Sequence, residues 1–368
     1  MKVYVALPVV WGLQGAVASS YLRSWGIDDC TQFATSIREA NASNTILNAS
    51  YILEQTLNVS GVLNNVSFCR LFGEVGYAGN NAVNFELWLP ASASYNSRFL
   101  VIGECNGGMA GTIAESDMVN GLNDGYAVAG GDAGHLASAN NNGNGEPGVY
   151  LPSRRLWRST PGPSILAQMC RCIPGFLFGS ETEWAMQEGE LADAFSIPIL
   201  QNIVFNNLSY NDTDFNWGSD VDAVDDNVGV FIDEISANLS SLRQSGAKMI
   251  LYQGWADPFN AAKWPIEHLY QIENFFGGDV SHWFRLFMVP GGGRCGSASN
   301  YPQVPGTWHA LEALAKWVES GEPPLQILGT DPADENLSGK TSKLCPWPQN
   351  AIYQNGDPDD WGSYVCAD

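Results

Sequence analysis

The sequence predicts an α/β fold in which helices cover a mostly parallel sheet. Four short apolar segments each run directly into a glycine-rich loop, as buried strands do in such a sheet: residues 99–102, 126–129, 247–252 and 284–289. Apolar residues then recur at helical spacing from Trp308 to Val318, and Gly321 stands where that helix would end. Because parallel strands present functional groups at their carboxyl ends, the glycine-rich loops are where we expect a site.

An amphipathic strand precedes these segments. Residues 83–89 alternate apolar and polar side chains, and we expect Val83, Phe85, Leu87 and Leu89 to face inward. Residues 137–147 are rich in Asn and Gly and predict a loop, whereas residues 151–184 show no clean periodicity.

The composition is that of a folded, acidic protein. The 368 residues are 45% hydrophobic and 15% charged, with a net charge of -22 and a pI near 4.3. This apolar content supports a large core rather than disorder. So acidic a surface repels phosphate backbones and anionic lipids, so we expect no nucleic-acid and no membrane partner. Neutral or phenolic small molecules remain compatible.

The first 18 residues resemble a secretory signal. Met1 and Lys2 give a basic start, residues 3–15 are apolar, and Ala16-Val17-Ala18 has the small residues of a cleavage site. The alternative is a buried first strand or helix. Secretion is also favoured by N-glycosylation sequons, at Asn41, Asn48, Asn58, Asn65, Asn207, Asn211, Asn238 and Asn336. We therefore expect an extracellular protein.

The eight cysteines predict disulfides. They are Cys30, Cys69, Cys105, Cys170, Cys172, Cys295, Cys345 and Cys366. An even number in a secreted chain favours disulfide bonds, although the spacing does not determine their pairing. Cys170 and Cys172 are too close to bond comfortably with each other. A Cys-x-Cys metal site lacks a second ligand pair, and the cluster from Asp220 to Asp226 lacks the pattern of a calcium loop, so we expect no metal.

Several ordered motifs from about Phe68 to the end together resemble the tannase and feruloyl esterase family. They are Phe68-Cys69-Arg70, Asn106-Gly107-Gly108, Asp132-Ala133-Gly134-His135, Pro174-Gly175 with Gly179-Ser180-Glu181, Gly254-Trp255-Ala256-Asp257-Pro258, residues 284–295, and Leu344-Cys345-Pro346-Trp347-Pro348-Gln349 with Cys366. The resemblance implies an α/β-hydrolase fold with N-terminal antiparallel strands and a reduced cap. It also implies carboxylic ester hydrolysis of small phenolic or gallate esters, without a cofactor.

The family's catalytic residues carry over only in part. Its members resemble serine esterases with a Ser, Asp, His triad, and a disulfide joins the cysteine before the serine to the cysteine after the histidine. Asp257 stands at the place of the triad acid, and Cys295 at that of the second cysteine. Arg294 occupies the place of the histidine, and arginine stays protonated, so it cannot act as a base. The chain has no cysteine followed by serine and no Gly-x-Ser-x-Gly sequence. The nucleophile strand and most of the lid are missing between His135 and Pro174.

Two loops complete the predicted site. The resemblance implies that Asn106, Gly107 and Gly108 form an oxyanion and substrate loop, and that Asp132 and His135 form a supporting turn. Asp257 alone could be an ordinary turn residue before a proline. Cys105 with His135 would be the alternative nucleophile and base.

We expect four segments. Residues 1–18 are the signal, 19–136 the N-terminal part of the hydrolase core, 137–245 a loop with a remnant of the lid, and 246–368 the C-terminal part of the core with its tail. Three hypotheses follow: a shortened product of an esterase gene, a pseudoenzyme that binds phenolic or sugar esters, or an enzyme with another nucleophile. We favour the first, because strand, helix and lid are lost together.

Overall fold

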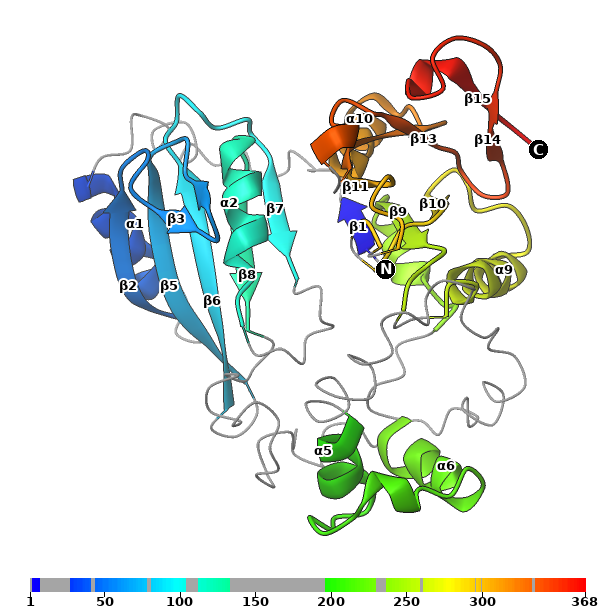
Figure 1. Cartoon of the computed structure of the whole chain (residues 1–368). Helices are drawn as coiled ribbons and strands as arrows, with labels where there is room; N and C mark the ends of the chain where they lie inside the picture. The colour runs from blue at the N-terminus through cyan, green and yellow to red at the C-terminus, as the bar shows by residue number, and fades with distance from the viewer. Residues whose placement is uncertain are drawn as a thin grey trace. The chain divides into compact units, whose positions relative to one another are not determined.

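The chain divides into two compact units, one formed by residues 11–159 and the other by residues 1–10 with 160–368. The computed structural model (Figure 1) describes residues 2–6, 27–40, 44–77, 81–103, 112–132, 196–229, 236–258, 261–294, 296–298, 300–332 and 335–368. Several predictions therefore lie outside the described residues: most of the predicted signal, the Asn-rich loop at 137–147, the segment at 151–184, and the sequon at Asn41.

The unit of residues 11–159 is built on a five-stranded sheet of order β2-β5-β6-β8-β7. Its strands are β2 (Asn44–Ile52), β5 (Phe68–Tyr77), β6 (Asn81–Pro90), β8 (Ala127–Gly131) and β7 (Phe99–Ile102). The first four pair antiparallel, and β7 runs parallel to β8. A small hairpin, β3 (Asn58–Val59) and β4 (Val62–Leu63), lies between β2 and β5 in the chain. The predicted N-terminal antiparallel strands are confirmed.

One helix covers each face of this sheet. Helix α1 (Ile27–Ala40) packs Cys30 and Ala34 against Ile46 and Leu71, and the disulfide Cys30–Cys69 ties the helix to β5. Helix α2 (Glu115–Asn123) lies over the other face, where a side chain on Gly130 would meet the sulfur of Met118. The sheet is thus the centre of a layered α/β unit.

Strand β6 is buried on both faces, which differs from the prediction of a single inward face. Of the residues predicted to face inward, Phe85, Leu87 and Leu89 pack against the core that includes α1. Like Val83, they are only partly buried. On the other face Glu86 is 5% exposed and Trp88 is fully buried. Side chains do alternate along β6, but α2 also covers the face that carries Glu86, and this helix leaves neither face open to solvent.

The other unit is centred on a three-stranded sheet of order β1-β9-β10. Strands β9 (Lys248–Gly254) and β10 (Phe284–Val289) are parallel, and β1 (Lys2–Ala6) pairs antiparallel with β9. Successive side chains of β9 enter different cores. Ile250 packs with Leu314 and Trp317 of α10 (Ala310–Ser320), whereas Leu251 packs with Ile266 and Leu269 of α9 (Trp264–Phe276). Because successive side chains of a strand point to opposite faces, both faces of β9 are covered, one by α10 and the other by α9.

Smaller elements surround this sheet. A second sheet has the order β11-β12-β13, and the tail forms a hairpin: β11 (Pro305–Trp308), β12 (Ile327–Pro332), β13 (Ser342–Leu344), β14 (Asn350–Tyr353) and β15 (Tyr364–Ala367). The disulfide Cys345–Cys366 anchors the hairpin. The short helices are α5 (Ile197–Ile199), η4 (Leu200–Val204), η5 (Asp212–Asp214), α6 (Ser219–Val224), η6 (Asp225–Gly229), α8 (Ser240–Gln244), η7 (Glu335–Leu337) and η8 (Trp361–Ser363).

The predicted α/β class is confirmed, with three differences. The four apolar segments form strands β7, β8, β9 and β10, but as one parallel pair in each unit's sheet. The predicted helix begins at Ala310, because Trp308 belongs to β11, and its buried residues are Ala310, Leu314 and Trp317. Lys2–Ala6, within the predicted signal, form a strand, which is the alternative interpretation of that segment. Removal of residues 1–18 stays a prediction. Within the described residues, helices long and apolar enough to span a bilayer are absent.

Candidate active site

The carboxyl end of β9 positions a buried carboxylate. Asp257 is 1% exposed and accepts a hydrogen bond from Gln253, whose Nε2 lies 2.7 Å from Asp257 Oδ2. Gln253 is itself fully buried, and the same nitrogen also donates to the carbonyl of Gly254 at 3.1 Å. A side chain fixed in this way holds one carboxylate oxygen in a single position, as the acid of a triad must be held.

The loop after β10 is bound directly to the loop after β9. The Trp255 amide donates to the carbonyl of Val289, and the Ala256 amide donates to that of Gly292, both at 2.9 Å. Gly254 makes this approach possible, because a Cβ at that position would lie 2.1 Å from the oxygen of Gly292. The two strand ends therefore form one rigid junction.

Arg294 lies five residues after the end of β10, in the loop that this junction holds, and it is partly buried. A guanidinium stays protonated at any pH at which the protein is folded, so it donates hydrogen bonds but accepts no proton. The junction thus offers a fixed carboxylate and a permanent cation, and neither group deprotonates a hydroxyl as a triad base does.

A cavity of about 310 Å³ opens beside Pro290, the first residue after β10. Its other lining residues are Gln303, Val304, Trp308, Lys340, Thr341, Ser342, Lys343, Ala351, Pro358, Asp359 and Tyr364. Lys340 pairs with Asp359 at 2.8 Å, and Lys343 lies 5.1 Å over the ring of Trp361. The cavity combines aromatic walls with basic side chains and is of the size that small-molecule sites have, about 300–1,000 Å³.

The other predicted site residues divide into two groups. Asn106, Gly107, Gly108 and His135 lie outside the described residues, as does Cys295. Asp132 is 1% exposed at the end of β8, where its carboxylate accepts hydrogen bonds from the backbone amide (3.0 Å) and side-chain amide (2.6 Å) of Asn84. Asp132 therefore ties the end of β8 to β6. Its part in a catalytic turn stays a prediction.

Sequence reasoning missed Gln253, although its loop was singled out. The signal was a lone polar residue at the end of an apolar strand, four positions before a buried aspartate. A buried polar side chain needs a partner, and Asp257 provides one. Within the described residues, the Oε1 atom of Gln253 has no hydrogen-bond partner although it is buried. In the described part of the chain, groups of three or more His, Cys, Asp or Glu able to hold a metal ion are absent.

Comparison with known proteins identifies the scaffold. A family model described as tannase and feruloyl esterase matches residues 69–148 and 160–367. A probable feruloyl esterase of Arthroderma benhamiae is 33% identical over 134 residues, which are 35% of this chain and 24% of that protein. The mono(2-hydroxyethyl) terephthalate hydrolase of Piscinibacter sakaiensis is 35% identical over 138 residues, or 36% of this chain and 22% of that protein. The chain thus spans about a quarter of the length of these relatives.

Solved structures show the same fold. Feruloyl esterase B from Aspergillus oryzae superposes with a TM-score of 0.70 at 14% identity, over 93% of this chain and 100% of that one. The tannin acyl hydrolase from Aspergillus niger gives a TM-score of 0.57 at 15% identity, over 93% and 95% of the two chains. The predicted α/β-hydrolase-like fold is therefore confirmed.

Proposed function

Since this chain belongs to the tannase and feruloyl esterase family of ester hydrolases, we propose that it keeps the scaffold and the triad acid of a secreted serine esterase but does not itself hydrolyse esters. The observation that carries the proposal is the pair of residues at the junction of β9 and β10. Asp257 is fixed and buried, but Arg294 stands where the base would be, and the sequence has no nucleophile motif. Loss of triad members removes most of the rate and leaves only the contribution of binding and oxyanion contacts.

Steady-state assays on the full chain test this proposal. With methyl ferulate and methyl gallate we expect the purified protein to match the rate of buffer alone. The control variant Asp257→Asn keeps an acceptor for Gln253 but removes the charge, and we expect it to be equally inactive. Turnover above the blank that falls in Asp257→Asn would show a working triad and overturn the proposal. A fluorophosphonate probe adds a second readout, and we expect no adduct.

The cavity beside Pro290 favours a second candidate, the binding of a small phenolic ester without cleavage. Its aromatic walls suit a phenol ring. Isothermal titration with methyl ferulate would measure the affinity. Ala351 lines the cavity and is exposed, so Ala351→Trp should fill it and weaken binding at least about ten-fold, or about 1.4 kcal/mol. Ile352→Trp on the same strand points to the opposite face and is the matched control. Equal affinities in the two variants would exclude the cavity as the site.

Export and gene structure need separate measurements. We propose an extracellular location from the first 18 residues and the sequons. N-terminal sequencing of secreted protein should find Ser19 first. The transcript across codons 135–174 distinguishes a shortened product from a natural pseudoenzyme, because the former predicts a longer form that encodes a serine nucleophile.

A further inference from the structure

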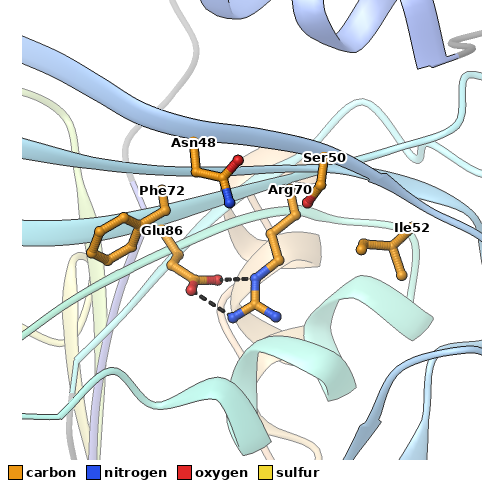
Figure 2. Close-up of a pocket in the computed structure, with 6 residues that line it drawn as sticks. All are labelled: Asn48, Ser50, Ile52, Arg70, Phe72 and Glu86. Carbon is orange, nitrogen blue, oxygen red and sulfur yellow. Dashed lines mark hydrogen bonds and ion pairs between the residues drawn. The ribbon is translucent and has the colours of Figure 1, made fainter.

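A cavity lies on the sheet of residues 11–159, on strands that do not belong to the candidate active site. It measures about 250 Å³ and is lined by side chains of β2, β5 and β6: Asn48, Ser50, Ile52, Arg70, Phe72 and Glu86 (Figure 2). Figure 2 shows these six side chains on the same side of the sheet. The volume is slightly below the range of about 300–1,000 Å³ of typical small-molecule sites, so it suits one sugar ring better than a chain of them.

The charges in this cavity favour a neutral occupant. Arg70 donates through Nε to Glu86 Oε2 at 2.8 Å and through Nη2 to Glu86 Oε1 at 2.6 Å. The same Nη2 lies 2.7 Å from a carboxylate oxygen of Glu115 on α2. One cation thus faces two carboxylates, and the chain as a whole carries a charge of -22. An anionic ligand would be repelled, whereas a polar uncharged group would not.

One residue that lines this cavity, Asn48, is also the asparagine of a predicted glycosylation sequon. Asn48-Ala49-Ser50 is a glycosylation sequence, and alternation along β2 places Asn48 and Ser50 on the cavity side. Asn48 is exposed, and its side-chain amide makes no hydrogen bond within the described residues. By contrast, the side-chain oxygen of Asn238 accepts from the backbone amide of Ser240 at 3.2 Å. The side-chain oxygens of Asn207 and Asn211 likewise accept from backbone amides two residues on, those of Ser209 and Thr213. Asn58 accepts from the backbone amide of Gly61, and Asn65 from the side-chain amide of Gln55.

We propose that Asn48 carries an N-linked glycan and that its first N-acetylglucosamine occupies this cavity. Phe72 offers a partly buried ring against which the C–H face of a sugar packs, and Ser50 and Arg70 offer polar groups for its hydroxyls. A lipid-linked oligosaccharyl diphosphate supplies the glycan. Asn48 Nδ2 bonds to C1 of the sugar, the bond from C1 to the diphosphate oxygen breaks, and the amide loses one proton. This goes beyond the proposed function and uses only its prediction of export.

The first test is attachment. The full chain is secreted from yeast, and glycopeptides are mapped by mass spectrometry. We expect Asn48 to be modified. An unmodified Asn48 overturns the proposal, and modification at Asn238 in the same sample would show that export had succeeded.

The second test is occupancy of the cavity, measured by hydrogen exchange of β2 and β5. Ser50→Ala and Asn48→Gln each remove the glycan at Asn48, and we expect amides there to exchange about five-fold faster or more. Ser240→Ala removes the glycan at Asn238 but keeps the bond to its backbone amide, so β2 and β5 should be unchanged. Endoglycosidase H leaves one N-acetylglucosamine on each site, and protection should survive this trimming. If trimmed protein exchanges as fast as Asn48→Gln, or if all forms exchange alike, the sugar does not fill the cavity.

Discussion

At Gly254 the loop after β9 lies against the backbone of the loop after β10, so one added methyl group should destabilise the candidate site. In Gly254→Ala the new Cβ would lie 2.1 Å from the carbonyl oxygen of Gly292 and 2.2 Å from that of Gly293. Both neighbours are backbone atoms, so a change of side-chain rotamer does not relieve the clash. The β9 and β10 loops must separate by roughly 1 Å to restore ordinary contact.

The cost follows from what that separation breaks. The hydrogen bonds from Trp255 to Val289 and from Ala256 to Gly292 are both 2.9 Å long and join the loops that must part. Each contributes about 1 kcal/mol, and overpacking adds about 1–3 kcal/mol, so we expect a loss of about 3 kcal/mol or more. Asp257 follows directly and should lose its fixed position with the junction.

Hydrogen exchange under native conditions measures this loss peptide by peptide, which suits a chain with two units. Peptides covering β9 and β10 should lose protection in Gly254→Ala. Gly103→Ala is the matched control, because a Cβ at Gly103 would meet nothing within 4 Å. Opening free energies within about 1 kcal/mol of the wild type in Gly254→Ala would refute the reasoning.

Three further perturbations have defined outcomes. Arg70→Met leaves the carboxylate of Glu86, which is 5% exposed, without its cation, so the opening free energy of β6 measured by hydrogen exchange should fall by about 2–4 kcal/mol. Adding Glu86→Gln should recover much of this stability, and no recovery would contradict a charge effect. Removing the Cys30–Cys69 disulfide, which closes a separation of 39 residues, should cost up to about 4 kcal/mol in urea unfolding, and an unchanged midpoint would contradict this. Hydrogen bonds from the amide and hydroxyl of Ser281 lower the pKa of Asp279. Its stabilising contribution is therefore present above its usual pKa and lost as the pH falls, and Asp279→Asn should flatten that acid limb of stability.

Strands were predictable where apolar residues followed one another. The predicted burial of segment 99–102 was wrong, because Phe99 and Val101 are 58% and 69% exposed. The predicted segments 99–102 and 284–289 coincide with β7 and β10, and 247–252 falls within β9 but for its first residue. Their assignment to sheets was not predictable, because an apolar run indicates a strand but does not identify its partner strand. The predicted start of the last helix was also wrong by two residues, because apolar spacing does not separate a strand from the helix that follows it. A buried tryptophan at the end of β11 continues the helical spacing of α10 by coincidence.

The candidate site was predictable where a family motif lay after a strand. Asp257 was predicted in this way; the structure buries it, and its role as the triad acid stays a prediction. Gln253 was not predicted, because a lone polar residue at the end of an apolar strand does not show which group it binds, and only the structure joins it to Asp257 four positions later. The cavity beside Pro290 was equally hidden, since its walls come from segments more than 70 residues apart. Hydrophobic periodicity predicts neither the hydrogen bond between Gln253 and Asp257 nor the walls of this cavity.

Pairing of strand β1 with β9 is incompatible with removal of the same residues as a secretory signal. Lys2 to Ala6 cover the free edge of β9, opposite the edge taken by β10, and the same residues begin the predicted secretory signal. If this strand pairs with β9 before export, the predicted signal is not accessible to the translocation machinery. A chain that loses its leader leaves β9 with unpaired amides and carbonyls, which attract another strand. Retained and exported copies would then differ in architecture, and not merely in length.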